Sequence, residues 1–93
     1  MEVKYSEHIK NRLSVRKIEY DLPQKIFEQS EERYFDKETG HLVATMKVEI
    51  YSKIREVMIA YVIEENYTKL LTIHPLKEGQ KENRAKTGRW RKI

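Results

Sequence analysis

The spacing of apolar residues changes along the chain, from a period of four near the N-terminus to a period of two in the middle. A narrow apolar stripe through Tyr5, Ile9 and Leu13 predicts a helix over residues 7–16, with Ser6 as its N-cap. The amphipathic pattern therefore places one face of this helix against a core.

The segment Asp21-Leu22-Pro23 predicts the start of a second helix that ends near Ser30. Aspartate is a good N-cap, and proline is tolerated in the first turn because its missing N–H has no partner there.

From Arg33 onward the pattern is typical of strands. A strand begins at Tyr34-Phe35, and Gly40 closes its turn. Strict alternation then predicts a half-buried strand over 42–51. After a turn at Ser52-Lys53, residues 54–64 are apolar on both faces, which predicts a central strand.

The last predicted strand runs up to His74 and is stopped by Pro75. Alternation assigns Leu71 and Ile73 to one of its faces, and Leu70, Thr72 and His74 to the other. A third helix over about 78–87 is compatible with the sequence but has little apolar surface to bury.

These elements predict an α+β fold for a single domain over 1–93. Two N-terminal helices would pack on a four-stranded antiparallel meander sheet, followed by a basic C-terminal helix or arm. A chain of 93 residues with 39% hydrophobic positions can build one core.

Composition narrows the class of protein. With no cysteine, a disulfide framework and a thiolate metal site are excluded. The longest apolar run, Val57–Ile63, is far shorter than the roughly 20 residues that span a membrane. The N-terminus matches no secretory or transit signal. We therefore expect a soluble, cytoplasmic protein without membrane association.

The positive charge is concentrated at the C-terminus. Residues 77–93 contain seven Lys or Arg against two acids, which gives a local charge of +5 in a chain whose total is +4. This concentration favours a polyanionic partner, although a solvated charged surface is the alternative.

Only three histidines are present: His8, His41 and His74. They form no His-Glu-x-x-His pattern, so neither a metal site nor another cofactor is expected. His74 ends a strand and suits proton transfer, and His8 lies at the rim of the first helix. Either could instead be a structural, hydrogen-bonded histidine. Thr72 shares a predicted face with His74 and could help to hold a phosphate.

Arginines are the stronger signal, because a guanidinium binds phosphate through two planar donors. Trp90 stands between two of them and offers a stacking surface for an unpaired base. Alternatively, Trp90 anchors the C-terminus to the core. The candidates for nucleic-acid contacts are Arg12, Arg16, Arg55, Arg84, Arg89 and Arg91.

No Gly-rich phosphate loop, Gly-x-Ser-x-Gly motif or cysteine nucleophile is present, and paired carboxylates occur only in predicted turns. Serine, cysteine and two-carboxylate hydrolases are therefore disfavoured.

Several motifs carry a resemblance to a known family: His8-x-x-x-Arg12, Arg33-Tyr34-Phe35-Asp36, Thr72-Ile73-His74-Pro75-Leu76, and Arg84 followed by Gly88-Arg89-Trp90. Over nearly its whole length the chain resembles small prokaryotic proteins related to RelE- and BrnT-like toxins, within the barnase–EndoU–RelE-like ribonuclease folds. The resemblance implies metal-free RNA cleavage on an open sheet face near His74, Arg84 and Arg89, with His8 and Arg12 opposite.

The leading hypothesis is thus a small metal-independent endoribonuclease, the toxin of a toxin–antitoxin pair. His74 and His8 would move protons while Arg84, Arg89 or Arg12 stabilises the charged phosphate. RNA is the expected partner, together with a cognate small antitoxin protein. A non-catalytic nucleic-acid-binding module and a protein-interaction domain are the alternatives.

Overall fold

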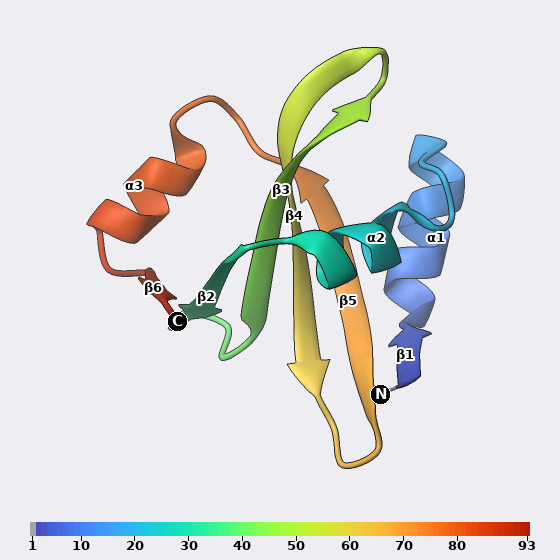
Figure 1. Ribbon diagram of the computed structural model, residues 1–93, viewed down its shortest axis with the longest axis horizontal. Coiled ribbons are helices and arrows are strands. Elements are labelled where there is room, and N and C mark those ends of the chain that lie inside the picture. The colour runs from blue at the N-terminus through green and yellow to red at the C-terminus, as the bar shows by residue number, and fades with distance from the viewer. Residues whose placement is uncertain (1) are drawn as a thin grey trace.

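The computed structural model describes residues 2–93 and has an α+β architecture with three helices and one sheet (Figure 1). The two N-terminal helices, α1 (Glu7–Arg16) and α2 (Leu22–Gln29), agree with the sequence pattern. The Ser6 hydroxyl accepts a hydrogen bond from the amide of Ile9 and so caps α1 as expected. A short third helix, α3 (Gln80–Lys86), lies at the other end of the sheet.

The sheet has six strands in the order β1-β5-β4-β3-β2-β6. Its centre is the antiparallel series formed by β2 (Glu32–Asp36), β3 (Leu42–Ile50), β4 (Lys53–Ile63) and β5 (Tyr67–Pro75). These four strands are the predicted meander.

The two outer strands were not predicted, and they make the sheet six-stranded and mixed instead of four-stranded and antiparallel. β1 (Glu2–Tyr5) precedes α1 and pairs parallel to β5. β6 (Trp90–Lys92) comes from the presumed basic arm and pairs antiparallel to β2. Both strands are very short, and short segments carry little periodicity, so pairing with a neighbour decides their conformation.

The face assignment in β5 also needs correction. The β4–β5 register shifts between Ala60 and Tyr61, and Leu71 has no register partner at this irregularity. The extra residue reverses the alternation, so Leu70 joins Ile73 in the core while Leu71 lies with Thr72 and His74 on the side of the opposite cluster.

The hairpin between β3 and β4 turns one residue earlier than predicted. Tyr51 and Ser52 both adopt positive φ, at 54° and 63°. Positive φ at both central residues is the geometry of a two-residue turn whose twist matches that of the flanking strands.

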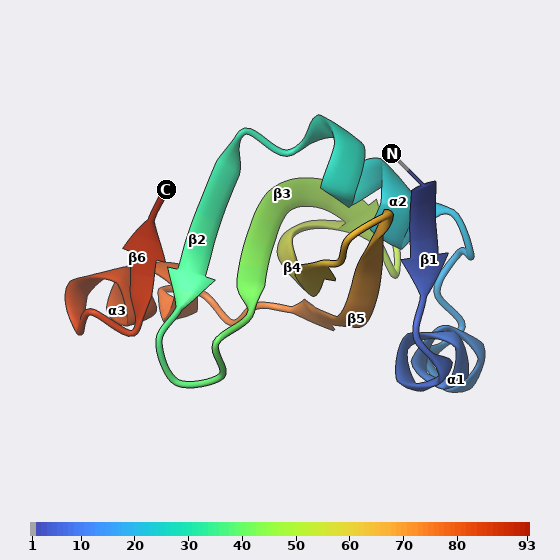
Figure 2. The ribbon, with the colours of Figure 1, turned by 90° about the horizontal axis from the view of Figure 1, so that it is seen from below.

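Apolar side chains form a cluster on each face of the sheet. The larger cluster joins Ile9 and Leu13 of α1 and Ile26 of α2 to the sheet. The smaller cluster surrounds Trp90 on the opposite face. Figure 2 shows α2 over one face, with α1 and α3 at the two ends of the sheet and no helix among residues 2–93 over the other face between them.

No helix within residues 2–93 has the length and apolar character needed to cross a membrane.

Candidate functional site

The face without a covering helix carries the predicted His74 and Thr72. In the antiparallel register, Thr45 pairs with Met58, and Met58 pairs with His74, so these three side chains lie side by side across β3, β4 and β5. Two residues further along β4, Ala60 pairs with Thr72 on the same face. The β5 irregularity at Leu71 is what directs Thr72 and His74 to this face.

Arg12 connects α1 to the end of β5. Its Nε donates a hydrogen bond to the Ile73 carbonyl oxygen at 2.7 Å, and its Nη2 donates to Nδ1 of His74 at 2.6 Å. On the other side of the imidazole, Nε2 of His74 lies 3.3 Å from the Thr72 hydroxyl. These three residues form a hydrogen-bonded series, the Arg12–His74–Thr72 row.

The geometry selects one form of the His74 ring. A guanidinium can only donate, so Nδ1 accepts and carries no hydrogen. In the neutral imidazole the hydrogen is therefore on Nε2, which donates to the Thr72 oxygen. The nitrogen that can accept a proton is Nδ1, and Arg12 holds it.

The surroundings of His74 favour its neutral form. Partial burial lowers the pKa of His74 most, and the positive charge of Arg12 lowers it further. His8, Arg16 and Arg84 also contribute in the same direction, so they are close enough to act electrostatically on the ring. Of the predicted residues, the structure places Arg12 and Thr72 in hydrogen-bonding contact with His74.

Trp90 and Arg84 are placed together, but not as an exposed base-stacking platform. The Trp90 side chain is 1% exposed and belongs to the smaller apolar cluster. The Arg84 guanidinium lies 5.1 Å from the ring centroid, a cation–π contact that covers the indole. This arrangement corresponds to the anchoring alternative for Trp90.

Arg89 and Arg91 have other contacts. Arg89 donates from Nε and Nη2 to the two carboxylate oxygens of Asp36, at 3.1 and 3.2 Å. Burial alone would raise the pKa of Asp36, but the hydrogen bonds from Arg89 and from the Glu38 amide outweigh it and lower that pKa. Arg91 lies 5.5 Å from the Phe35 ring centroid. Arg89 is thus engaged in an ion pair, away from the Arg12–His74–Thr72 row.

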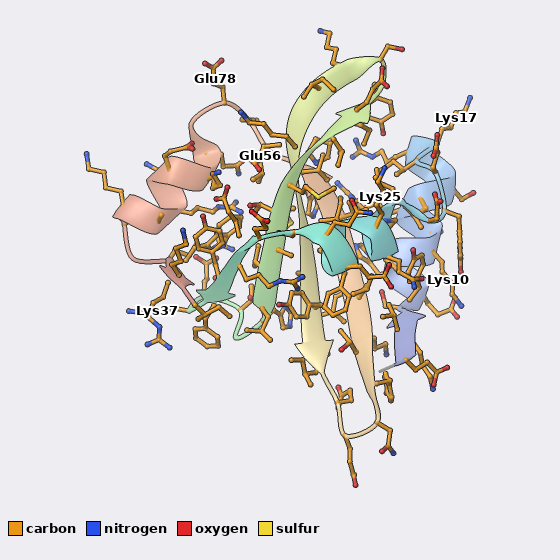
Figure 3. The ribbon with its side chains drawn as sticks, in the orientation of Figure 1. Lys10, Lys17, Lys25, Lys37, Glu56 and Glu78 are labelled. Carbon is orange, nitrogen blue, oxygen red and sulfur yellow. The ribbon has the colours of Figure 1, made fainter. Side chains whose placement is uncertain are left out.

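A charged group that the sequence analysis missed lies between α3 and the sheet. Lys81 Nζ is 3.0 Å from Oε1 of Glu32 and 3.0 Å from Oε1 of Glu56. The Tyr34 hydroxyl also donates to Glu32 Oε1, at 3.0 Å. Lys81 and Glu32 are 49 positions apart, and no local spacing signals such a contact. Figure 3 shows Glu56 on the side of the β3–β4 pair that faces α3.

Within residues 2–93, no group of three or more His, Asp or Glu side chains is arranged to hold a metal ion.

No family model matches the sequence, and neither a curated protein nor a solved structure shows significant similarity to the chain.

Proposed function

We propose that this protein is a small metal-independent endoribonuclease that binds single-stranded RNA on the face of the sheet carrying the Arg12–His74–Thr72 row. The observation that supports this proposal best is the position of a neutral imidazole between a guanidinium and a hydroxyl, on the part of the face between α1 and α3. The resemblance of His8-x-x-x-Arg12 and Thr72-Ile73-His74-Pro75 to RelE- and BrnT-like toxins points to the same activity.

The charge around this row suits a phosphodiester. Arg12, Arg16 and Arg84 contribute permanent positive charge near His74. Guanidinium groups bind phosphate oxygens through paired donors, and they stabilise the extra negative charge that develops as the phosphorus becomes five-coordinate.

In the proposed reaction the RNA supplies its own nucleophile. The ribose 2′-oxygen attacks the adjacent phosphorus, the bond from phosphorus to the 5′-oxygen breaks, and the products carry a 2′,3′-cyclic phosphate and a 5′-hydroxyl. His74 accepts the proton of the 2′-hydroxyl, and His8 gives a proton to the departing 5′-oxygen.

The contact between Arg12 and His74 has to open for this step. A phosphate oxygen competes for Nη2 of Arg12, and its binding would release Nδ1 of His74 to accept the proton. Meanwhile the hydrogen bond from Arg12 Nε to the Ile73 carbonyl keeps the guanidinium in place.

The test is cleavage of a fluorescently labelled single-stranded RNA in the presence of EDTA. We expect cyclic-phosphate products from the native chain, and a loss of about 10²–10⁴ in rate for His74→Gln. Arg12→Gln should weaken both binding and cleavage. The matched control is Lys25→Gln, which removes one exposed positive charge from α2 on the other face. Intact RNA after incubation with native protein that does bind it would rule out the enzyme.

A non-catalytic RNA-binding module is the second candidate, because both ring nitrogens of His74 are already hydrogen-bonded in this structure. Such a module would bind RNA with strong salt dependence and form no product. Arg12→Gln would then reduce the slope of log affinity against log salt, whereas His74→Gln would leave affinity nearly unchanged.

The toxin role is a further part of the proposal. Expression of an active ribonuclease should arrest growth, and His74→Gln should relieve the arrest. A cognate small antitoxin protein would restore growth when it is co-expressed. Growth that continues during expression of protein shown to cleave RNA would argue against this role.

A further inference from the structure

The outer edge of β1 is open to a further strand. β1 is the last strand of the sheet formed by residues 2–93, and its register with β5 is regular from Glu2 to Tyr5. It contains neither a proline nor a bulge, two devices that block pairing at a sheet edge. Figure 2 shows β1 as the outermost strand at the α1 end of the sheet.

The direction of the backbone groups in β1 follows from one contact. The amide of Ser6, directly after the strand, donates to the Leu70 carbonyl oxygen of β5 at 2.9 Å. Backbone groups of successive residues point to opposite sides of a strand, so those of Lys4 also point towards β5. The N–H and C=O groups of Val3 and Tyr5 therefore point away from the sheet, where no strand of the described part of the chain pairs with them.

The space beside this edge is not filled by side chains. A hollow of about 360 Å³ lies along β1 and is lined by Val3, Lys4 and Tyr5 together with Tyr20. The Tyr20 side chain is 64% exposed, and its ring centroid lies 4.9 Å from that of Tyr5. A strand placed against β1 would therefore meet unpaired backbone groups and an exposed aromatic ring.

The side chains of β1 are complementary to a second copy of the same strand. Antiparallel pairing about a two-fold axis at Val3 lets the two Val3 residues exchange two hydrogen bonds, because their backbone groups point outwards. The same pairing places Glu2 of each copy opposite Lys4 of the other, on one face. Oppositely charged cross-strand pairs stabilise a sheet, so the lysine that repels other basic strands is matched by Glu2 of a second copy.

The opposite edge of the sheet lacks this complementarity. β6 carries Arg91 and Lys92 and no acidic residue. Two copies of β6 would therefore bring positive side chains together, and like charges on neighbouring strands destabilise their pairing. Of the two edges, β1 is thus the one suited to self-pairing.

We propose that two copies of this chain associate through antiparallel pairing of their β1 strands, with Val3 on the two-fold axis and a Glu2–Lys4 pair on each side of it. The two sheets then form one continuous sheet. Because the two-fold axis is perpendicular to the sheet at β1, both Arg12–His74–Thr72 rows lie on the same side of the dimer. This inference goes beyond the proposed function and does not require RNA binding.

Sedimentation velocity over a range of protein concentrations tests the association. We expect a monomer–dimer equilibrium for the tag-free native chain, weakened by high salt. Glu2→Lys and Lys4→Glu should each weaken the dimer by about 10-fold or more, because each substitution replaces two attractive pairs by two like-charge pairs. Both side chains are exposed, so we expect both variants to fold, and circular dichroism checks this.

A mixture of the two single variants is the sharpest test. When a Glu2→Lys chain pairs with a Lys4→Glu chain, each basic side chain lies opposite an acidic one. We expect this mixture to form heterodimers about as strongly as the native chain forms homodimers. The double variant Glu2→Lys/Lys4→Glu should also dimerise, because exchange of the two charges preserves both pairs. The matched control is Lys25→Glu, which reverses one exposed charge on α2 and should leave the dimer intact.

Amide hydrogen exchange locates the contact. Exchange of the Val3 amide, measured by NMR, should slow as the protein concentration rises, whereas the Lys4 amide already points towards β5 and should change little. A native chain that stays monomeric up to about 1 mM would overturn the inference. So would a dimer that both single variants form as strongly as the native chain, or a mixture of the two variants that stays monomeric.

Discussion

Arg12 donates a hydrogen bond from Nη2 to Nδ1 of His74 at 2.6 Å, across a sequence separation of 62 residues. The contact joins the first helix to the last long strand, it selects the tautomer of the imidazole, and together with burial it favours the neutral form. The behaviour of His74 should therefore depend directly on Arg12.

We expect Arg12→Gln to raise the pKa of His74, because the substitution removes a nearby positive charge that lowers it. Burial of the ring would still hold the pKa below its ordinary value. NMR titration of the imidazole protons measures the change. Lys25→Gln, with the same loss of charge on α2, should leave the His74 titration as it is in the native chain.

The stability of the protein should fall with acid in a range set by His74. The folded state lowers the pKa of His74, so the unfolded state binds more protons once the pH is below the unfolded value of about 6.5. The part of the free energy of unfolding that is linked to His74 is thus lost as the pH decreases from about 7.5 to about 5.5. We expect the free energy of unfolding, measured with urea over this pH range, to vary less with pH for His74→Gln than for the native protein. Parallel profiles would contradict the assignment.

Trp90 should contribute strongly to stability and little to base stacking. Its ring is 1% exposed, so Trp90→Ala should cost about 3–5 kcal/mol in the free energy of unfolding. Trp90→Phe keeps an aromatic ring and should cost less. Chemical denaturation measures both. RNA should leave the fluorescence of the single tryptophan nearly unchanged. Strong quenching by RNA would support the stacking role instead.

Breaking the Arg89–Asp36 pair should destabilise the fold. The Asp36 side chain is 5% exposed, and Arg89→Gln would leave its carboxylate buried without its ionic partner. We expect a loss of about 1–3 kcal/mol in the free energy of unfolding. Arg91→Gln, at an exposed position of β6, serves as the control and should cost much less. Equal losses in the free energy of unfolding for the two variants would show that Arg89 acts through the overall charge of the protein and not through its ion pair with Asp36.

The turn between β3 and β4 offers a stabilising substitution. Ser52 adopts φ 63°, a conformation that is costly for a residue with a side chain and easy for glycine. Ser52→Gly should therefore raise the free energy of unfolding by about 0.5–1 kcal/mol after the added flexibility of the unfolded chain is counted. The same substitution at Ser14, inside α1, should lower it by about 0.5 kcal/mol.

Local signals in the sequence are sufficient for the long elements. The four-residue spacing in α1 and the alternation in β3 each report burial of one face, and the apolar run in β4 reports burial of both. Pro23 marks the first turn of α2, although Asp21 makes no side-chain capping hydrogen bond there. The histidine and arginine content also identifies the residues that meet at the Arg12–His74–Thr72 row. The spacing of Arg12 in the first helix places it at the rim of the apolar stripe, where it can reach a neighbouring strand.

Tertiary structure decided what depends on pairing between distant segments. β1 and β6 are strands because β5 and β2 offer unpaired edges, and backbone groups at an edge are best satisfied by another strand. One unpaired residue at Leu71 sets the faces of the second half of β5, and alternation by itself cannot reveal a bulge. The Glu32–Lys81–Glu56 group likewise exists only because α3 packs beside β2 and β4. The sequence alone therefore identified the residues of the row, whereas the Glu32–Lys81–Glu56 group depends on contacts between segments far apart in the chain.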